Sequence, residues 1–254
     1  MMIALYCRIQ EEKQPPVHSA AWRKKVFDQI EQKTVKMGIF EKKRRIGQTI
    51  ISIERSGNEA KVASVTELDL SLKISTRLTM HKIKGLTDFR CEMQKGSFKL
   101  FALSEQTERG LALIMTDGNG NRISRIAVGD GMGLSNGFSP FIAMPPLVVG
   151  ARWPINYYNP LTGGVGEGEA EVVEKVRHPW KDGFINAYRV RFHAKFLKVT
   201  VMEADIIVTP EGDVLEEEIR LIQSMSRLAK RYILRAEDVT PEDLRRIRKL
   251  NERL

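Results

Sequence analysis

The sequence predicts a mainly β protein: one long, curved antiparallel meander sheet, either an open or a half-closed barrel, with a short amphipathic helix at each end. Three observations support this. Apolar and polar residues alternate over residues 68–80, as in a strand with one face in the core and one in water. Turn sequences recur at roughly ten-residue intervals, which is typical of consecutive hairpins. Both ends of the chain show helical spacing instead.

The alternation is clearest in the middle of the first half. Apolar residues occupy every second position, with Thr76 as the interruption: Leu68, Leu70, Leu72, Ile74, Leu78 and Met80. A helix would scatter these residues around its whole surface. We therefore expect one long strand over residues 68–80, with its leucines against the protein interior.

Further strands are expected on both sides of this segment. Residues 35–40 and 46–54 flank a charged turn at 41–44, and Gly38 and Gly47 are placed where a bulge or a close approach would suit. Later turns are marked by Ser56-Gly57-Asn58, Lys84-Gly85, Lys95-Gly96, Glu108-Arg109-Gly110 and Asp117-Gly118-Asn119-Gly120. The last of these is a strong hairpin signal.

A segment rich in glycine and proline, residues 129–150, interrupts the alternation. We expect it to be a long crossing between two meander halves. Alternation then resumes at residues 152–158, 169–177, 187–196, 199–208 and 214–222. The expected organisation is an apolar start, proline linker and amphipathic helix over 1–34, an antiparallel β domain over 35–235, and a basic C-terminal helix over 236–254.

The helical spacing at each end is specific. Over residues 19–33, Ser19 is a suitable N-cap, and the apolar residues at helical spacing are Trp22, Val26, Phe27 and Ile30. Near the C-terminus, Thr240 and Pro241 suit the N-cap and the first helical position. The buried stripe of this second helix is expected to be Leu244, Ile247 and Leu250.

The net charge of +9 is concentrated at the two ends. Residues 1–45 carry 11 Lys/Arg against 5 Asp/Glu, and residues 220–254 carry 10 against 5, so the middle is nearly neutral. Basic ends can contact an anionic membrane or a partner protein, or can simply be solvated surface helices. The residues expected on such a surface are Lys24, Lys25, Arg245, Arg246 and Lys249. Nucleic acid is disfavoured, because no aromatic residue is interleaved with arginine in these segments.

Catalytic and metal-binding constellations are missing from the sequence. Cys7 and Cys91 form neither a disulfide framework nor a zinc motif. The glycine run at 129–133 lacks the Lys-Ser/Thr pair of a phosphate loop, and residues 117–121 lack the downstream Glu of a calcium loop. We therefore expect no enzymatic activity, metal or cofactor. A hydrolase built on His81, His178 or His193 is the alternative.

A curved sheet has a concave side that can hold a hydrophobic ligand. The apolar residues in and beyond the glycine- and proline-rich segment are expected to line its mouth: Phe138, Phe141, Ile142, Met144, Leu147 and Val148. The competing interpretation is that these residues close the core.

The first seven residues are apolar but too short for a signal peptide or a membrane span. Two interpretations remain open: a cytoplasmic chain that begins here, or the tail of an export or anchor segment that starts upstream of Met1.

Three short motifs resemble a known group of proteins. They are Met37-Gly38-Ile39-Phe40 followed by Arg45-Ile46-Gly47, then Asn159-Pro160-Leu161-Thr162-Gly163, and finally Gly212-Asp213-Val214-Leu215-Glu216. They resemble the exported bacterial β-sheet domain that precedes transglutaminase-like peptidases, and uncharacterised periplasmic proteins with curved sheets similar to lipoprotein carriers. Asn159 replaces the usual acid, the initial tryptophan of the first strand is absent, and no peptidase domain follows. The resemblance implies a fold and an envelope location, and no reaction.

Together these observations predict a non-catalytic binding protein of the bacterial cell envelope, periplasmic or membrane-associated, that holds a lipid, hydrophobic ligand or peptide segment in a curved sheet. The alternative is a structural or accessory subunit that binds another envelope protein through a sheet edge or its terminal helices.

Overall fold

The computed structural model describes residues 24, 27–69, 71–108, 110–127, 132–134, 144–159, 164–196, 199–222 and 229–253. These residues form one sheet of fifteen strands, followed by helix α3 (Pro241–Arg253). The first-half strands are β1 (Lys33–Glu41), β2 (Arg44–Ser56), β3 (Glu59–Leu68), β4 (Leu72–His81), β5 (Gly85–Lys95), β6 (Phe98–Thr107), β7 (Gly110–Asp117) and β8 (Arg122–Ala127). Those after them are β9 (Met132–Leu134), β10 (Arg152–Asn159), β11 (Gly164–Trp180), β12 (Gly183–Phe196), β13 (Val199–Val208), β14 (Val214–Ile222) and β15 (Ala229–Glu237).

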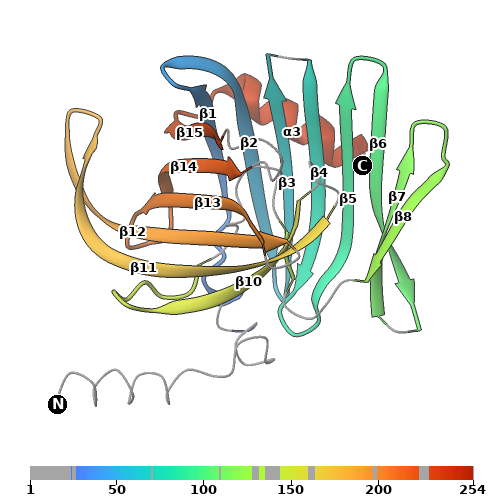
Figure 1. Cartoon of the computed structure of the whole chain (residues 1–254), viewed down its shortest axis with the longest axis horizontal. Coiled ribbons are helices and arrows are strands. Elements are labelled where there is room, and N and C mark those ends of the chain that lie inside the picture. The colour runs from blue at the N-terminus through green and yellow to red at the C-terminus, as the bar shows by residue number, and fades with distance from the viewer. Residues whose placement is uncertain are drawn as a thin grey trace.

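The chain enters the sheet at its middle. From β1 it meanders outward to β8 at one edge, and the second half returns from β10 inward to β15, which pairs with β1 (Figure 1). β9 lies beyond β10 at the other edge and pairs with it in parallel, whereas the other neighbouring strands are antiparallel. Because β8 and β9 do not pair with each other among the described residues, the sheet is open rather than closed.

Two glycines lie where a close approach occurs, as the sequence predicted: Gly47 against β3 within the first half, and Gly38 beside β15 where the two halves meet. A Cβ added at Gly47 would clash with the backbone oxygen of Glu67, and one at Gly38 would clash with the Glu237 carboxylate. The register of β1 against β2 also shifts between Ile39 and Phe40. Only glycine fits at position 47, because a side chain there would force the backbones apart, whereas at position 38 the obstacle is the flexible end of the Glu237 side chain.

The prediction of one long strand over residues 68–80 is wrong in one respect. Leu68 ends β3, and β4 begins at Leu72, with Ser71 between them at φ +58°. Leu68 and Leu72 face each other across this hairpin. Residues directly opposite each other in a hairpin share a face of the sheet, so a three-residue connection keeps the alternation in phase.

Three further expectations need correction. β11 extends well beyond the predicted 169–177, and β15 was not predicted although it joins the two halves. The helix expected over 19–33 does not reach its expected end, because Lys33 already belongs to β1. Most of its length lies outside the described residues.

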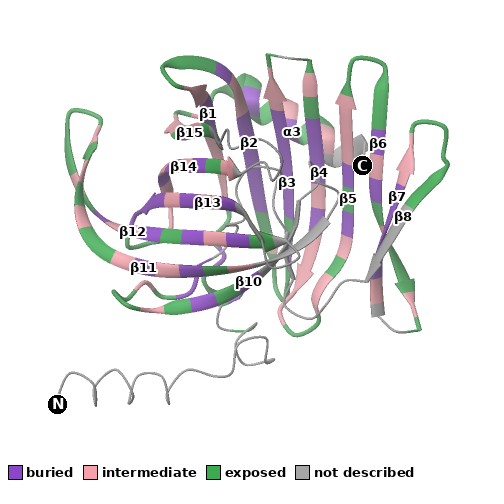
Figure 2. Ribbon diagram, viewed as in Figure 1, coloured by how far each residue is buried: buried purple, intermediate pink, exposed green. Residues whose placement is uncertain are grey.

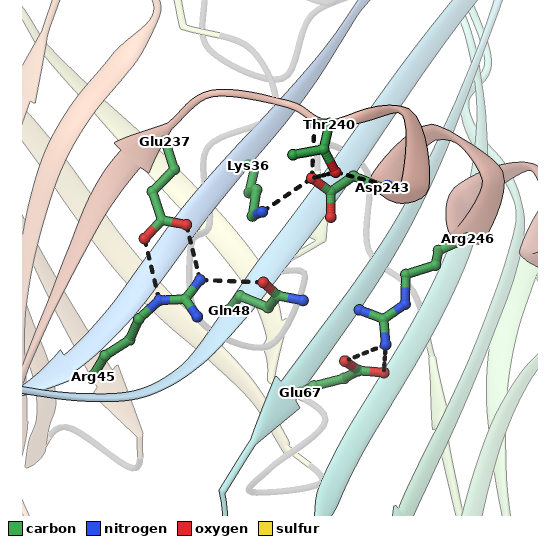
Figure 3. A network of polar contacts seen from close by, with 8 residues as sticks. All are labelled: Lys36, Arg45, Gln48, Glu67, Glu237, Thr240, Asp243 and Arg246. Atoms are coloured by element: carbon green, nitrogen blue, oxygen red, sulfur yellow. Dashed lines mark hydrogen bonds and ion pairs between the residues drawn. The ribbon is translucent and has the colours of Figure 1, made fainter.

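Helix α3 is held on the sheet by polar contacts at its N-terminus (Figure 3). The Thr240 hydroxyl and backbone N–H both donate to Asp243 Oδ2, at 2.7 and 2.9 Å, and the Asp243 N–H donates to Thr240 Oγ1 at 3.3 Å. This is a reciprocal capping box, with aspartate in the usual place of glutamate. Lys36 Nζ on β1 adds an ion pair to Asp243 at 3.0 Å. Thr240 is thus the N-cap that the sequence predicted.

The apolar side of α3 covers β2 and β3. Ile247 is buried against Ala63 and Val65, and Leu250 packs beside it. Leu244, expected in this stripe, is instead 46% exposed. The contact face runs through Asp243 and Ile247, and Leu244 is rotated away from it.

Candidate functional site

The face of the sheet opposite α3 carries most of the buried apolar side chains, and we call it the inner face. Strand register places Met37, Thr49, Thr66 and Ile74 on it as consecutive neighbours across β1 to β4. α3 covers the outer face, on which Ala63 and Val65 lie. In Figure 2 the buried residues form bands along the strands of both halves. The sheet is therefore apolar on one side over most of its width.

The inner face contains two apolar clusters. The larger one spans β1, β2 and β10 to β15, with Phe192 and Val190 fully buried within it. The other spans β2 to β7 and includes Phe89 and Leu113, which are also fully buried. Burial of this extent explains how an open sheet is stable without closing into a barrel.

Segments outside the strands help to cover the inner face. Phe27 and Ile30, just before β1, are each 2% exposed and pack on the β2–β7 cluster. The Arg55 guanidinium lies 5.0 Å from the Phe27 ring centroid and donates a hydrogen bond to the Ile30 carbonyl at 3.1 Å. Asp28 accepts a hydrogen bond from Lys82, which lowers the pKa of this carboxyl. These contacts hold the segment on the sheet.

A belt of small polar side chains runs through the β2–β7 cluster on the inner face and reaches the larger cluster at Thr49, opposite Met37. It consists of Thr49, Ser64, Thr66, Thr76 and Cys91, on four neighbouring strands. The hydroxyls of Thr49 and Thr66 are 2.8 Å apart, and the Thr76 hydroxyl lies 3.8 Å from Cys91 Sγ. We call this set the polar belt. The sequence could not reveal it, because these residues belong to different strands.

Ser64 is the unusual member of the polar belt. It is 2% exposed, and its Oγ has no hydrogen-bond partner among the described residues. An unsatisfied buried hydroxyl costs about 1–3 kcal/mol. Such an atom inside an apolar face can donate to or accept from a polar group of a bound molecule.

The side chains of the polar belt carry no formal charge. Burial raises the pKa of the Cys91 thiol to about 12, so the thiol is protonated at physiological pH. It is therefore a weak hydrogen-bond donor and a poor nucleophile. An acidic side chain lies elsewhere on the inner face: Glu217 on β14 is fully buried opposite Leu234.

The structure places only part of the predicted mouth. Met144 is 6% exposed within the larger cluster, and Leu147 packs against that cluster. Val148 is 44% exposed and points away from it. Phe138, Phe141 and Ile142 lie outside the described residues. Met144 and Leu147 therefore pack with the larger cluster of the inner face.

The predicted basic surface is divided. Lys24, Arg245 and Lys249 are exposed, and Lys25 lies outside the described residues. Arg246 instead pairs with Glu67 on β3, with Nη2 and Oε2 3.0 Å apart, and so helps to hold α3 (Figure 3). A hollow of about 340 Å³ lies beside the helix, lined by Gln32, Lys33, Thr34, Ser52, Ile53, Glu54, Leu244, Ile247 and Arg248.

The histidines weighed as catalytic candidates lie on separate strands. His81 ends β4, and its Nδ1 accepts backbone N–H groups of the following turn at 3.1 and 3.3 Å. His178 and His193 lie on β11 and β12. In the described part of the chain, no three His, Cys, Asp or Glu side chains gather as a metal-ion site would require.

Comparisons with known proteins show similarity of fold. The chain resembles a β-barrel-like protein of domain of unknown function DUF1849 from Brucella abortus, with a TM-score of 0.51, 8% identity, and coverage of 82% of this chain and 96% of that one. This likeness supports a shared barrel-like fold and says nothing of function. No protein-family model and no curated protein sequence matches.

Two other solved structures are more distant. A DUF1089 family protein from Pseudomonas aeruginosa has a TM-score of 0.34 at 12% identity, covering 66% of this chain and 87% of that one. A proposed exported protein with a YmcC-like fold from Bacteroides fragilis has a TM-score of 0.30 at 6% identity, covering 81% and 95%. The link to domains that precede transglutaminase-like peptidases stays a prediction. The described segments contain no helix long and apolar enough to cross a bilayer.

Proposed function

We propose that this chain is a non-catalytic binding protein of the bacterial cell envelope that holds a lipid, hydrophobic ligand or peptide segment against its inner face. The observation that supports this most is the polar belt set into an apolar face, with Ser64 Oγ buried and without a partner among the described residues. Ligand sites in proteins commonly combine apolar walls with a few polar groups that fix orientation.

The ligand that suits this surface has a long apolar part and an uncharged polar group. The apolar part packs on the two clusters, and a hydroxyl or carbonyl oxygen meets Ser64 and Thr76. A charged head group fits poorly here, because burying an unpaired charge is costly. Entry requires a covering segment to move, and the short segment at Phe27 to Ile30 is one candidate.

Binding can be tested with the purified full-length chain. Organic extraction followed by mass spectrometry identifies lipid that co-purifies with it. Displacement of bound N-phenyl-1-naphthylamine by oleyl alcohol then gives an affinity for a molecule with one hydroxyl. The variant Ser64→Ala with Thr76→Val keeps the face apolar but removes two hydroxyls.

Loss of one or two hydrogen bonds should lower the affinity for oleyl alcohol about three- to tenfold, while binding of the apolar probe is unchanged. Thr116→Val is the matched control, because Thr116 lies on the outer face of β7. The proposal fails if the protein carries no lipid and does not bind the probe, or if the inner and outer variants bind oleyl alcohol equally well.

A second candidate is an accessory subunit that pairs its sheet edge with another envelope protein. The sheet order favours it, since β8 is an edge strand, and the apolar side chains of Leu103 and Ile123 nearby are 43% and 55% exposed. Edge strands can accept a strand from a partner. Crosslinking followed by pull-down would recover a protein through β8 if this is right, and only lipid if it is wrong.

A further inference from the structure

The hairpin of β11 and β12 projects beyond its neighbours in the sheet. β10 pairs with β11 only as far as Glu171, and β13 pairs with β12 only from Tyr188 onward. Residues 174–187 therefore form a two-stranded ribbon, which rises at one side of the molecule in Figure 1. We call this segment the ribbon. A lone ribbon is marginal in water, so something must hold it in place.

One side of the ribbon is packed and the other is exposed. Val176, Trp180 and Ile185 lie on the packed side, where they join an apolar cluster with Ile207 and Leu215. The other side carries Lys175, Arg177 and Phe184, which are exposed. Tyr188 lies on the same side at the base of the ribbon, where it is half-buried against the larger inner-face cluster. The packing holds the ribbon in a defined orientation and presents its basic and aromatic side to the surroundings.

Phe184 lies just after the turn and is 61% exposed. The Arg177 guanidinium lies 4.6 Å from its ring centroid, and Lys175 Nζ lies 5.6 Å from that of Tyr188. Each aromatic ring on this side is thus paired with a cation. Stacking on nucleic-acid bases needs free ring faces, so the arrangement suits another anionic partner better.

The ribbon carries three basic side chains, Lys175, Arg177 and Lys181, against two acidic ones, Glu174 and Asp182. Arg189 at its base is neutralised by Glu174 at 2.7 Å, whereas Lys175 and Arg177 are exposed. Lys181 in the turn reaches Asp238 only at 3.4 Å, and these side chains are 65% and 92% exposed. Such a pair contributes little in water, which leaves Lys181 available to lipid phosphates.

We infer that the ribbon docks the protein on an anionic membrane surface. Phe184 enters the headgroup region, and Lys175, Arg177 and Lys181 lie against the lipid phosphates. Aromatic side chains are favoured at this interface, and basic side chains are attracted to anionic lipid. The inference goes beyond ligand holding, and it assigns membrane contact to a hairpin rather than to the basic ends of the chain.

Flotation of the full-length chain with vesicles tests this. The vesicles contain phosphatidylcholine alone or with about 30% phosphatidylglycerol, at about 0.05 M and about 0.5 M NaCl. The variant Phe184→Ser with Arg177→Gln removes one aromatic and one basic side chain from the exposed side. Its matched control is Ile83→Ser with Lys84→Gln, because Ile83 is 57% exposed beside an exposed lysine in the β4–β5 turn.

Wild type and control should bind the anionic vesicles at low salt. Removing Arg177 alone should weaken binding about fivefold, and removing Phe184 as well should weaken it further. Displacement of N-phenyl-1-naphthylamine should be equal in all four proteins, so a loss of vesicle binding alone would not reflect a loss of the ligand-holding function. The inference is overturned if the ribbon variant floats with anionic vesicles as well as the control does. It is also overturned if wild type binds single-stranded DNA more tightly than it binds vesicles and the loss of Phe184 weakens that DNA binding.

Discussion

Docking of α3 depends on the ion pair between Lys36 and Asp243, and a double-mutant cycle measures its contribution. The two side chains are 13% and 5% exposed, so the pair is largely removed from water. Asp243→Asn removes the charge with little change in shape. Lys36→Met keeps most of the apolar stem.

The burial of the Lys36–Asp243 pair sets the expected loss of stability. Removing one partner of a buried pair costs about 3–5 kcal/mol, and the residual exposure of Lys36 places Asp243→Asn near the lower limit of that range. Since 1 kcal/mol shifts Tm by about 2–4 °C in a domain of this size, Tm should fall by about 6–12 °C. Lys36→Met should cost less, because Asp243 keeps both hydrogen bonds from Thr240. The coupling energy should be about 1–3 kcal/mol.

Urea unfolding followed by far-UV circular dichroism gives the four free energies of the cycle. The comparison is a second cycle on Arg246 and Glu67, whose side chains are 39% and 30% exposed. That pair should couple by less than about 1 kcal/mol. A coupling energy for Lys36 and Asp243 no larger than that of the exposed pair would refute the reasoning.

The contribution of Asp243 to the free energy of unfolding depends on pH in a definite direction. Burial opposes ionisation of Asp243, but hydrogen bonds from Thr240 and Lys36 outweigh it and lower the pKa of this carboxyl. A lowered pKa contributes stability that is fully present above the unfolded value, about 3.9, and is lost as the pH falls through the folded value. The difference between wild type and Asp243→Asn should therefore be constant from neutral pH to about pH 5 and shrink below about pH 4.

Three other substitutions or reactions test the inner face and the sheet. Ser64→Ala should raise the unfolding free energy of the ligand-free protein by about 1 kcal/mol, because it removes a buried hydroxyl without a partner among the described residues; a loss of stability in urea titration would contradict this. Cys91, in a Cys7→Ser background, should resist iodoacetamide at pH 8 until the protein is unfolded, since its pKa is about 12 and it is 3% exposed; rapid labelling of folded protein would count against its burial. Gly47→Ala should cost at least about 2 kcal/mol because its Cβ meets a backbone oxygen, while Gly183→Ala, which meets open space, should be nearly neutral; equal Tm values would argue against the close approach.

Much of the sheet could be predicted because strand and turn signals are local. Asp117 shows this well, since its carboxylate accepts N–H groups from Asn119 and Asn121 and fixes the turn between β7 and β8. The boundary at Leu68 was missed for the opposite reason. The hairpin of β3 and β4 keeps the alternation in phase, so the pattern alone does not mark the turn.

Features that depend on pairing between distant segments could not be predicted. β15 carries several basic residues and gives a weak alternating signal, yet it lies beside β1 at the centre of the sheet. The polar belt likewise exists only when β2 to β5 are placed side by side. The exposure of Leu244 was missed because the capping contacts of Asp243, rather than the apolar pattern, set the rotation of α3.

The pairing of the first strand with the last one constrains how the molecule is made. Synthesis proceeds from β1, so one side of that strand has no neighbour until β15 has been completed. The two halves can be joined at this seam only when nearly the whole chain has emerged, which makes assembly of the full sheet a late event with large sequence separation. Removal of the last few dozen residues would therefore delete the central strand β15 and leave two separate partial sheets, rather than remove an edge strand from one sheet.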